Sequence, residues 1–234
     1  MGVRGLLWPS MEQTMSSPAP SRPALSCLAP SGFGATAVRR LMAFLVALML
    51  LTGPASAADT VGFVRQFGDE AIAMLRDRAA GEAERRQRFD TLMRNGFDLP
   101  LVAQLALGRH WRSATGEERS EYVGLFEQFV LETYARRLDE YGNQRLRVVG
   151  AVPAGQDSMV ESWIEGSGEP IRVDWRVRQT PAGARIVDVV IAGVSMLVTQ
   201  RSEFSTVIER SGGVAGLIAN LRQRVASVGQ VRSS

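Results

Sequence analysis

The sequence predicts an α+β fold: N-terminal helices, then a curved four-stranded antiparallel sheet, then closing C-terminal helices around an apolar cavity. Apolar residues recur with a helical period up to about residue 141 and with a period of two from there to residue 191. In addition, the segment 185–204 combines a β-branched run, a turn at Gly193 and a helix start at Ser195. Helices laid on one face of a curved sheet leave a tapering apolar gap, which is the expected cavity.

Residues 1–57 have the features of a leader that carries a secretory signal peptide. Arg39 and Arg40 precede the apolar run 41–51, and Ala55 to Ala57 supply a small-residue cleavage site. The run is too short to cross a bilayer, which takes about 20 residues. We expect cleavage after Ala57, with the start codon and the choice between Sec and twin-arginine export left open. Residues 58–234 are expected to form a single domain.

Charge and cysteine usage exclude several classes of function. The chain has 27 basic and 24 acidic residues, of which four and one lie in the leader, so 23 of each remain in the mature part. A net charge of zero argues against nucleic-acid binding. The single cysteine, Cys27, lies in the leader, and His110 is the single histidine. Zinc sites and Cys–His catalysis are therefore not expected, and we predict no metal and no catalytic residue.

Three helices are expected before residue 109. The first begins with Asp59 or Thr60 as its cap, the second covers 82–95, and the third is capped by Asp98 and ends at Gly108. Each carries apolar residues on one face, as a helix that packs on a core does.

A longer, more apolar helix follows. Thr115 and Glu118 have the spacing of a capping box, and the helical period continues to Tyr141. Its apolar stripe is wide and aromatic, more than one packing neighbour requires: Tyr122, Leu125, Phe126, Phe129, Val130, Tyr134, Leu138 and Tyr141.

Four strands and two helices complete the chain. The strands are expected around residues 146–148, 159–165, 171–178 and 186–191, and the glycine-containing segments 166–168 and 181–183 turn the chain between them. Such short connections predict an antiparallel meander. The closing helices begin at Ser195 and Val214, separated by the break 211–213.

The polar candidates have structural interpretations as well as functional ones. His110 beside Trp111 is expected to be structural. Asp188, inside an apolar strand, is either a paired structural carboxylate, with an arginine as one partner to consider, or an acid–base group. Ser195 has no nucleophile context and is expected to be a helix cap. The alternating arginines of the third strand are either solvated or a face that meets anionic head groups or an acidic partner: Arg172, Arg176 and Arg178.

Several segments together resemble the MlaC family, also called toluene-tolerance auxiliary proteins. The resemblance covers nearly all of the mature chain in the family's order. The matching segments are Phe97-Asp98-Leu99, 107–112 (LGRHWR) with Ala114-Thr115, 126–134, 170–177, Val187-Asp188-Val189, Gly193-Val194-Ser195 and 200–204 (QRSEF).

The resemblance implies a periplasmic carrier with a single lipid-binding domain and no cofactor, whose cargo is a bound phospholipid. The implied partners are an inner-membrane ABC transporter with an MCE-domain subunit and an outer-membrane lipoprotein–porin complex. The implied role is to maintain the lipid asymmetry of the outer membrane. A hopanoid or another lipid is the alternative cargo.

We expect an apolar lining for this cargo, called here the predicted lining set. It is drawn from the long helix, the third and fourth strands and the joint that follows: Phe126, Phe129, Val130, Tyr134, Val173, Trp175, Val177, Val189, Ile191, Met196 and Phe204. Two rival functions remain at this stage. One is a small α+β enzyme that uses Asp188, and the other is an adaptor with a solid core that binds through the Arg172, Arg176 and Arg178 face.

Overall fold

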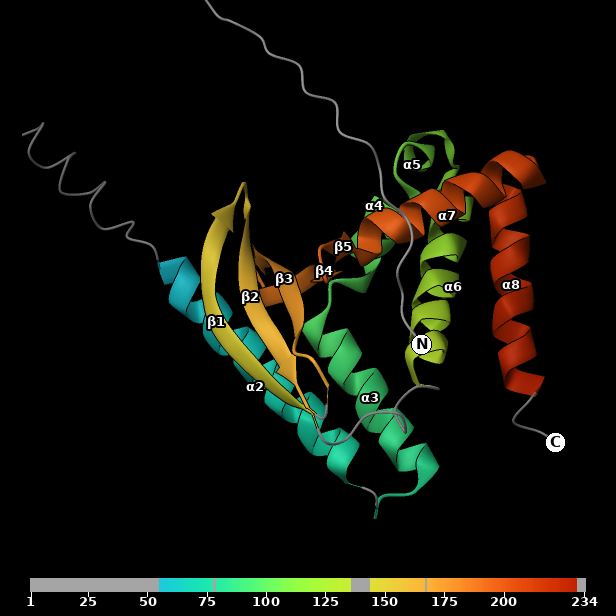
Figure 1. The fold of residues 1–234 in the computed structure, drawn as a ribbon. Helices are drawn as coiled ribbons and strands as arrows, with labels where there is room; N and C mark the ends of the chain where they lie inside the picture. Colours follow the sequence, from blue (N-terminus) through green and yellow to red (C-terminus); the bar gives the residue numbers. More distant parts are fainter. Residues whose placement is uncertain (1–54, 78, 136–143, 167, 231–234) are drawn as a thin grey trace, which may run out of the picture. The chain divides into compact units, whose positions relative to one another are not determined.

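The structure is a computed structural model, and it describes residues 55–77, 79–135, 144–166 and 168–230, which belong to one compact unit. Nearly all of the predicted leader, and the predicted extension of the long helix to Tyr141, lie outside these residues. The described elements are α2 (Ala55–Arg76), α3 (Glu82–Gly96), α4 (Leu99–Leu107), α5 (His110–Ser113), α6 (Gly116–Ala135), β1 (Arg145–Ala154), β2 (Asp157–Glu165), β3 (Ile171–Thr180), β4 (Gly183–Ile191), β5 (Val194–Ser195), α7 (Met196–Ser211) and α8 (Val214–Gln230) (Figure 1).

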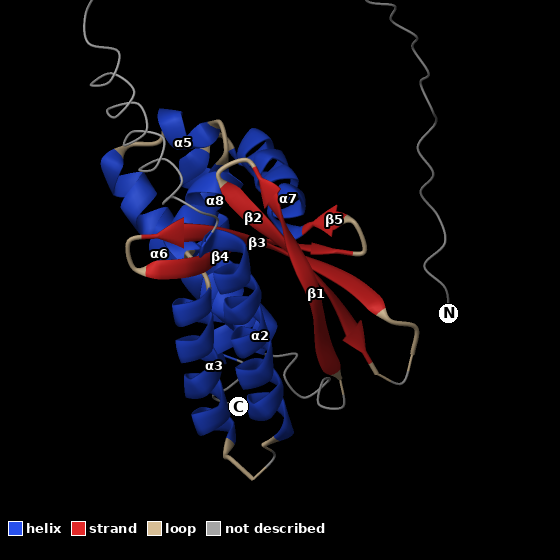
Figure 2. Ribbon diagram, turned by 90° about the vertical axis from the view of Figure 1, so that its left-hand side faces the viewer, coloured by secondary structure: helices blue, strands red, loops and turns tan. Residues whose placement is uncertain are grey.

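The strands form one antiparallel sheet in the order β1-β2-β3-β4-β5, in which each strand pairs with the next along the chain (Figure 2). The predicted α+β class and the four-strand meander are confirmed. Register shifts in β1, between Val148 and Gly150, and at Arg176 and Val177 of β3 add bulges, which bend and twist a sheet. The two-residue strand β5 was not predicted, because two residues are too few to show a period.

Most of the predicted helix starts are confirmed by their hydrogen bonds. Leu101 N donates to Asp98 Oδ1 at 3.1 Å, so Asp98 caps α4. Thr115 and Glu118 bond reciprocally, with Thr115 N donating to Glu118 Oε2 and Glu118 N donating to Thr115 Oγ1. The predicted cap at Asp59 or Thr60 is wrong, because α2 already begins at Ala55. The alanine-rich residues before Asp59 are strong helix formers and extend the helix.

Strand β4 is joined to helix α7 by a tight turn and a buried carboxylate. Ala192 and Gly193 turn the chain with φ of 49° and 84°. Asp188 is 6% exposed; its Oδ2 accepts from Ser195 Oγ at 2.6 Å and its Oδ1 from Leu197 N at 3.0 Å. Ser195 Oγ in turn accepts from Val198 N at 3.0 Å. Asp188 is thus a structural carboxylate that holds the first turn of α7, and its partners are a hydroxyl and a backbone N–H rather than an arginine.

Replacing Asp188 with alanine is expected to lower the free energy of unfolding by about 2–3 kcal/mol, because a hydroxyl and a buried N–H lose a charged acceptor. Asp188→Asn keeps one acceptor oxygen and should cost less. Urea denaturation measures both variants, and Glu203→Ala, on the exposed side of α7, is the control expected to change little. Unchanged stability in Asp188→Ala would contradict this role.

The apolar interior divides into three groups of buried and partly buried residues. The helix cluster joins α4, α6, α7 and α8, and its largest members are Leu107, Tyr122, Phe126, Phe129, Phe204, Leu217 and Leu221. The sheet cluster joins α2 to the sheet and includes Val64, Phe67, Phe97, Val160, Trp175, Val177 and Ile186. The junction cluster joins α2, α3 and α6 and includes Met74, Phe89, Leu92, Met93, Phe97, Val130 and Leu131.

Candidate functional site

The face of the sheet that α2 covers, called here the inner face, is apolar along β3. Val173 and Val177 are 2% and 1% exposed, and Trp175 between them is half-buried. Because side chains alternate along a strand, these three residues point to the same side. Val160 of β2 is paired with Trp175 in register and is fully buried. The inner face therefore presents a row of apolar side chains along β3, with Val160 beside them on β2.

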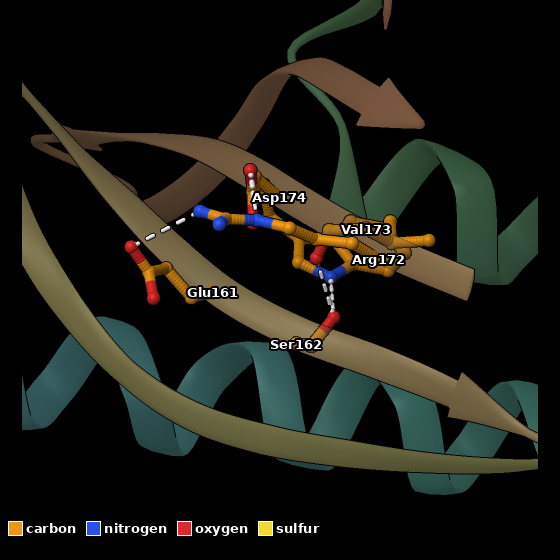
Figure 3. A network of polar contacts seen from close by, with 6 residues as sticks. Glu161, Ser162, Arg172, Val173 and Asp174 are labelled. Atoms are coloured by element: carbon orange, nitrogen blue, oxygen red, sulfur yellow. Dashed lines mark hydrogen bonds and ion pairs between the residues drawn. The ribbon is translucent and has the colours of Figure 1, made fainter. Parts of the chain in front are cut away.

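A buried hydroxyl on this surface binds the indole N–H of Trp175. Ser162 is fully buried, and its Oγ accepts from Trp175 Nε1 at 2.9 Å and donates to the backbone oxygen of Val173 at 2.6 Å (Figure 3). A buried indole N–H needs an acceptor, and here it finds one inside the sheet. The Trp175 ring is thus held in one orientation without presenting its polar edge to the interior.

One end of the inner face is apolar but not covered. Ile171 lies two residues before Val173 on the same side of β3, and Ile191 of β4 is paired with Val173 in register. Ile171 is 47% exposed and Ile191 is 40% exposed. An apolar sheet face continues here beyond the residues that α2 covers.

The helix cluster contains a tightly packed group of aromatic rings. The Phe204 ring centroid lies 6.0–6.4 Å from those of Tyr122, Phe126 and Phe129. The Tyr122 hydroxyl donates to the backbone oxygen of Ala103 at 3.0 Å, and burial raises the pKa of Tyr122. Tyr122 therefore stays neutral and acts as a packing residue.

A cavity of about 300 Å³ opens between α6 and α8 at the edge of the helix cluster. The two helices pack side by side (Figure 1), and the cavity lies between their C-terminal halves. Its lining mixes apolar and polar side chains: Phe129, Glu132, Thr133, Arg224, Val225 and Ser227. Phe129 is the member of the predicted lining set that faces this cavity.

An apolar path connects this cavity to the sheet. Phe129 adjoins Val130, which packs against both the helix cluster and the junction cluster. Phe97 belongs to the surroundings of both the junction cluster and the sheet cluster. From Phe97 the ring contacts continue to Phe67 at 5.7 Å and from Phe67 to Trp175 at 5.8 Å. Apolar side chains thus run from the α6–α8 cavity to the inner face of the sheet.

The structure places the predicted lining set in two groups. Phe126, Phe129, Val130 and Phe204 lie in or against the helix cluster. Trp175, Val177 and Val189 lie in or against the sheet cluster. The set does not form one wall, and the path just described links the two groups.

The other four members lie outside these two clusters. Val173 is buried and Met196 is half-buried at the start of α7. Tyr134 is 44% exposed near the end of α6, and Ile191 is exposed at the uncovered end of the inner face.

The arginines of β3 are already paired with carboxylates. Arg172 Nε donates to Asp174 Oδ2 at 2.9 Å, and its Nη2 lies 3.2 Å from Glu161 Oε1 (Figure 3). Hydrogen bonding to Asp174 raises the pKa of Arg172. The other two, Arg176 and Arg178, share Asp157, with Nε–O distances of 3.8 Å and 2.7 Å. This pairing leaves little net positive field for an acidic partner.

Neither a metal cluster nor a membrane-spanning helix is found in the described part of the chain. No three His, Cys, Asp or Glu side chains within it come together in a way that could hold a metal ion. None of its helices combines the length and the apolar character that crossing a bilayer requires. His110 accepts from Arg109 Nε at 3.2 Å beside the short helix α5.

Comparison with known proteins decides the family. The family model described as "MlaC protein" matches residues 65–223. The chain belongs to the MlaC family. This membership confirms the resemblance and the expectation that the chain is not an enzyme.

Two relatives of this MlaC-family chain are informative. One is the intermembrane phospholipid transport system binding protein MlaC of Haemophilus influenzae, which is 23% identical over 195 residues, covering 78% of this chain and 90% of the relative. The other is the structure of a phospholipid-binding protein from Ralstonia solanacearum in complex with a phospholipid. It is 28% identical with a TM-score of 0.66, and the match covers 73% of this chain and 99% of that one.

Two features of the candidate site were missed in the sequence. Ser162 interrupts the apolar row that contains Val160 and Ile164, and a hydroxyl at an inner-face position is a signal that could have been used. Arg224 had no such signal, because only its tertiary position at the α6–α8 cavity sets it apart from the other surface arginines.

Proposed function

We propose that this MlaC-family chain is a periplasmic carrier that holds the acyl chains of a phospholipid in its apolar interior and moves the lipid between the two membranes. The observation that carries the proposal is the match over nearly the full length of a solved relative that contains a phospholipid. The family match and the name of the Haemophilus influenzae relative support the same function.

Physical chemistry gives the reason for such a carrier. Two sixteen-carbon tails contain about 30 methylenes, each worth about 0.8 kcal/mol when removed from water, so exposing them costs ~25 kcal/mol. The carrier's interior must stabilise the acyl chains almost as well as a bilayer does. It must not stabilise them much more strongly, because the lipid has to be released again. An interior with few polar anchors meets both requirements.

We propose that the acyl chains lie along the apolar path and against the inner face of the sheet, contacted by the predicted lining set. Two features support this location. The path is apolar from Phe129 to Trp175, whose N–H is satisfied by Ser162. The inner face also continues, uncovered, to Ile171 and Ile191. Because Phe126 and Phe204 are almost fully buried, we propose that helix and sheet clusters separate as the lipid is taken up.

Membership of the MlaC family supports a proposal for the location and the partners. We propose export by a signal peptide within residues 1–57, a single lipid-binding domain over 58–234, and docking to the inner-membrane MCE-domain ABC transporter and the outer-membrane lipoprotein–porin complex. The described residues lie in one compact unit, which supports a single domain.

Native mass spectrometry of protein isolated from a Gram-negative periplasm tests the function. A mass increment of one lipid per chain, identified as phospholipid in an organic extract, is the expected result. A hopanoid in the extract would mean that the cargo is a hopanoid rather than a phospholipid, and the carrier function would stand. A chain recovered without any lipid, and unable to take one from vesicles, would contradict the proposal and favour the adaptor with a solid core.

A further inference from the structure

The cavity between α6 and α8 combines an apolar wall with a single cation. Phe129 and Val225 supply apolar surface, and Arg224 is the one basic residue among the described residues that line the cavity. Its guanidinium carbon lies 5.8 Å from the centroid of the Phe129 ring. The charge is therefore positioned where the apolar path from the sheet reaches the surface.

Arg224 differs from its neighbour Arg222 in what it pairs with. Arg222 Nε donates to Glu121 Oε1 at 2.6 Å. Arg224 is exposed, and its contact with Phe129 is not supplemented by a carboxylate from any described residue. An exposed cation–π contact with phenylalanine contributes little free energy. The Arg224 side chain can therefore leave Phe129 for a stronger partner at a small cost in free energy.

Apart from Arg224, the described residues of the lining offer no hydrogen-bond donor to a bound anion. The cavity lies between the C-terminal halves of α6 and α8, so the N-termini of these two helices, with their free backbone N–H groups, lie away from it. The hydroxyl of Thr133 donates to the Phe129 backbone oxygen, and that of Ser227 to the Arg224 backbone oxygen. Glu132 forms an ion pair with Arg86, which balances its charge. An oxyanion bound here would therefore depend on Arg224.

We propose that this cavity receives the head end of an anionic amphiphile, with Arg224 pairing with its oxyanion and Phe129 and Val225 contacting the first part of the hydrocarbon chain. This inference rests on the proposed function and adds a head-end site to it. Arginine suits the role because its planar guanidinium can bind two oxygens of a phosphate or carboxylate at once. The oxyanion is either the phosphodiester of a phospholipid or the carboxylate of a fatty acid.

Equilibrium binding of fluorescent lipids tests the proposal on the mature chain. The probes are phosphatidylglycerol, diacylglycerol and palmitate that carry the same fluorophore on the acyl chain. Arg224→Gln is expected to weaken phosphatidylglycerol binding by about tenfold, the size of a solvent-accessible charge-assisted pair, and to leave diacylglycerol binding unchanged. Arg224→Lys should fall between this variant and the wild type, since it keeps the charge but not the two-oxygen geometry.

Arg222→Gln is the matched control, because Arg222 is two residues away on the same helix and does not line the cavity. It should leave the binding of all three probes unchanged. A parallel loss of palmitate binding in Arg224→Gln would support a general oxyanion site, and a loss confined to phosphatidylglycerol would support a phosphate site.

Two results would overturn the proposal while the carrier function stands. One is unchanged phosphatidylglycerol binding in Arg224→Gln, and the other is an equal loss with diacylglycerol. A wild-type chain that binds none of the probes would contradict the proposed function itself, and the head-end site with it.

Discussion

Replacing Ile191 with glutamate is expected to lower the affinity for phospholipid on the order of 100-fold while the protein remains folded. Ile191 is 40% exposed on the inner face, so the carboxylate of a glutamate at this position stays hydrated in the lipid-free protein. Hydrocarbon packed against this position would strip that water, at a cost of roughly 3 kcal/mol or more. Lipid transfer from vesicles measures the affinity, and thermal unfolding verifies the fold.

Val152→Glu on β1 is the control for this prediction. Val152 is 50% exposed and is paired with Met159, so it points away from the inner face. It should bind lipid as the wild type does. Equal losses in both variants would mean that the charge acts through stability or solubility, and full lipid binding in Ile191→Glu would remove the inner face from the lipid site.

Replacing Phe204 with alanine is expected to lower the free energy of unfolding by about 3–5 kcal/mol, since it deletes a buried ring and leaves a cavity. Phe204 is 3% exposed and contacts the rings of Tyr122, Phe126 and Phe129. Chemical denaturation of protein stripped of lipid measures the change, because bound lipid would stabilise the folded state by mass action.

Val198→Ala serves as the comparison on the same helix, because Val198 is 57% exposed and should change stability little. If the Phe204→Ala variant lost less than about 1 kcal/mol, the aromatic group would be loosely packed in the unloaded protein rather than a core. Phe204 would then line an open cavity without any separation of the clusters.

Local signals in the sequence were enough to predict most of the fold. The β4–α7 joint was predicted because its determinants, Gly193 and Ser195, lie within a few residues of what they control. The start of α2 was misplaced because alanines without a cap continued the helix. The end of α4 at Gly108 was predicted as well, but the hydrogen bond from Arg201 Nε to the Leu105 backbone oxygen, 2.9 Å long, joins residues far apart in the sequence, and no local pattern reveals such a contact.

The candidate site was less predictable for a different reason. Periodicity identifies the face of an element on which a residue lies, but not the neighbouring element that covers that face. Phe126 and Trp175 were both correctly expected on apolar faces, yet they belong to separate clusters because α6 packs on α8 while the sheet packs on α2. The pairing of Arg178 with Asp157 likewise depends on the register of two strands.

Photo-cross-linking with a phospholipid that carries a diazirine near the end of one acyl chain tests the central claim most directly. If the acyl chains lie along the apolar path and the inner face, the labelled tryptic peptides will be those covering 120–136, 173–176 and 186–201, which hold the predicted lining set except Val177 and Phe204. Labelling that avoids all three peptides would place the hydrocarbon elsewhere on the protein and contradict the account.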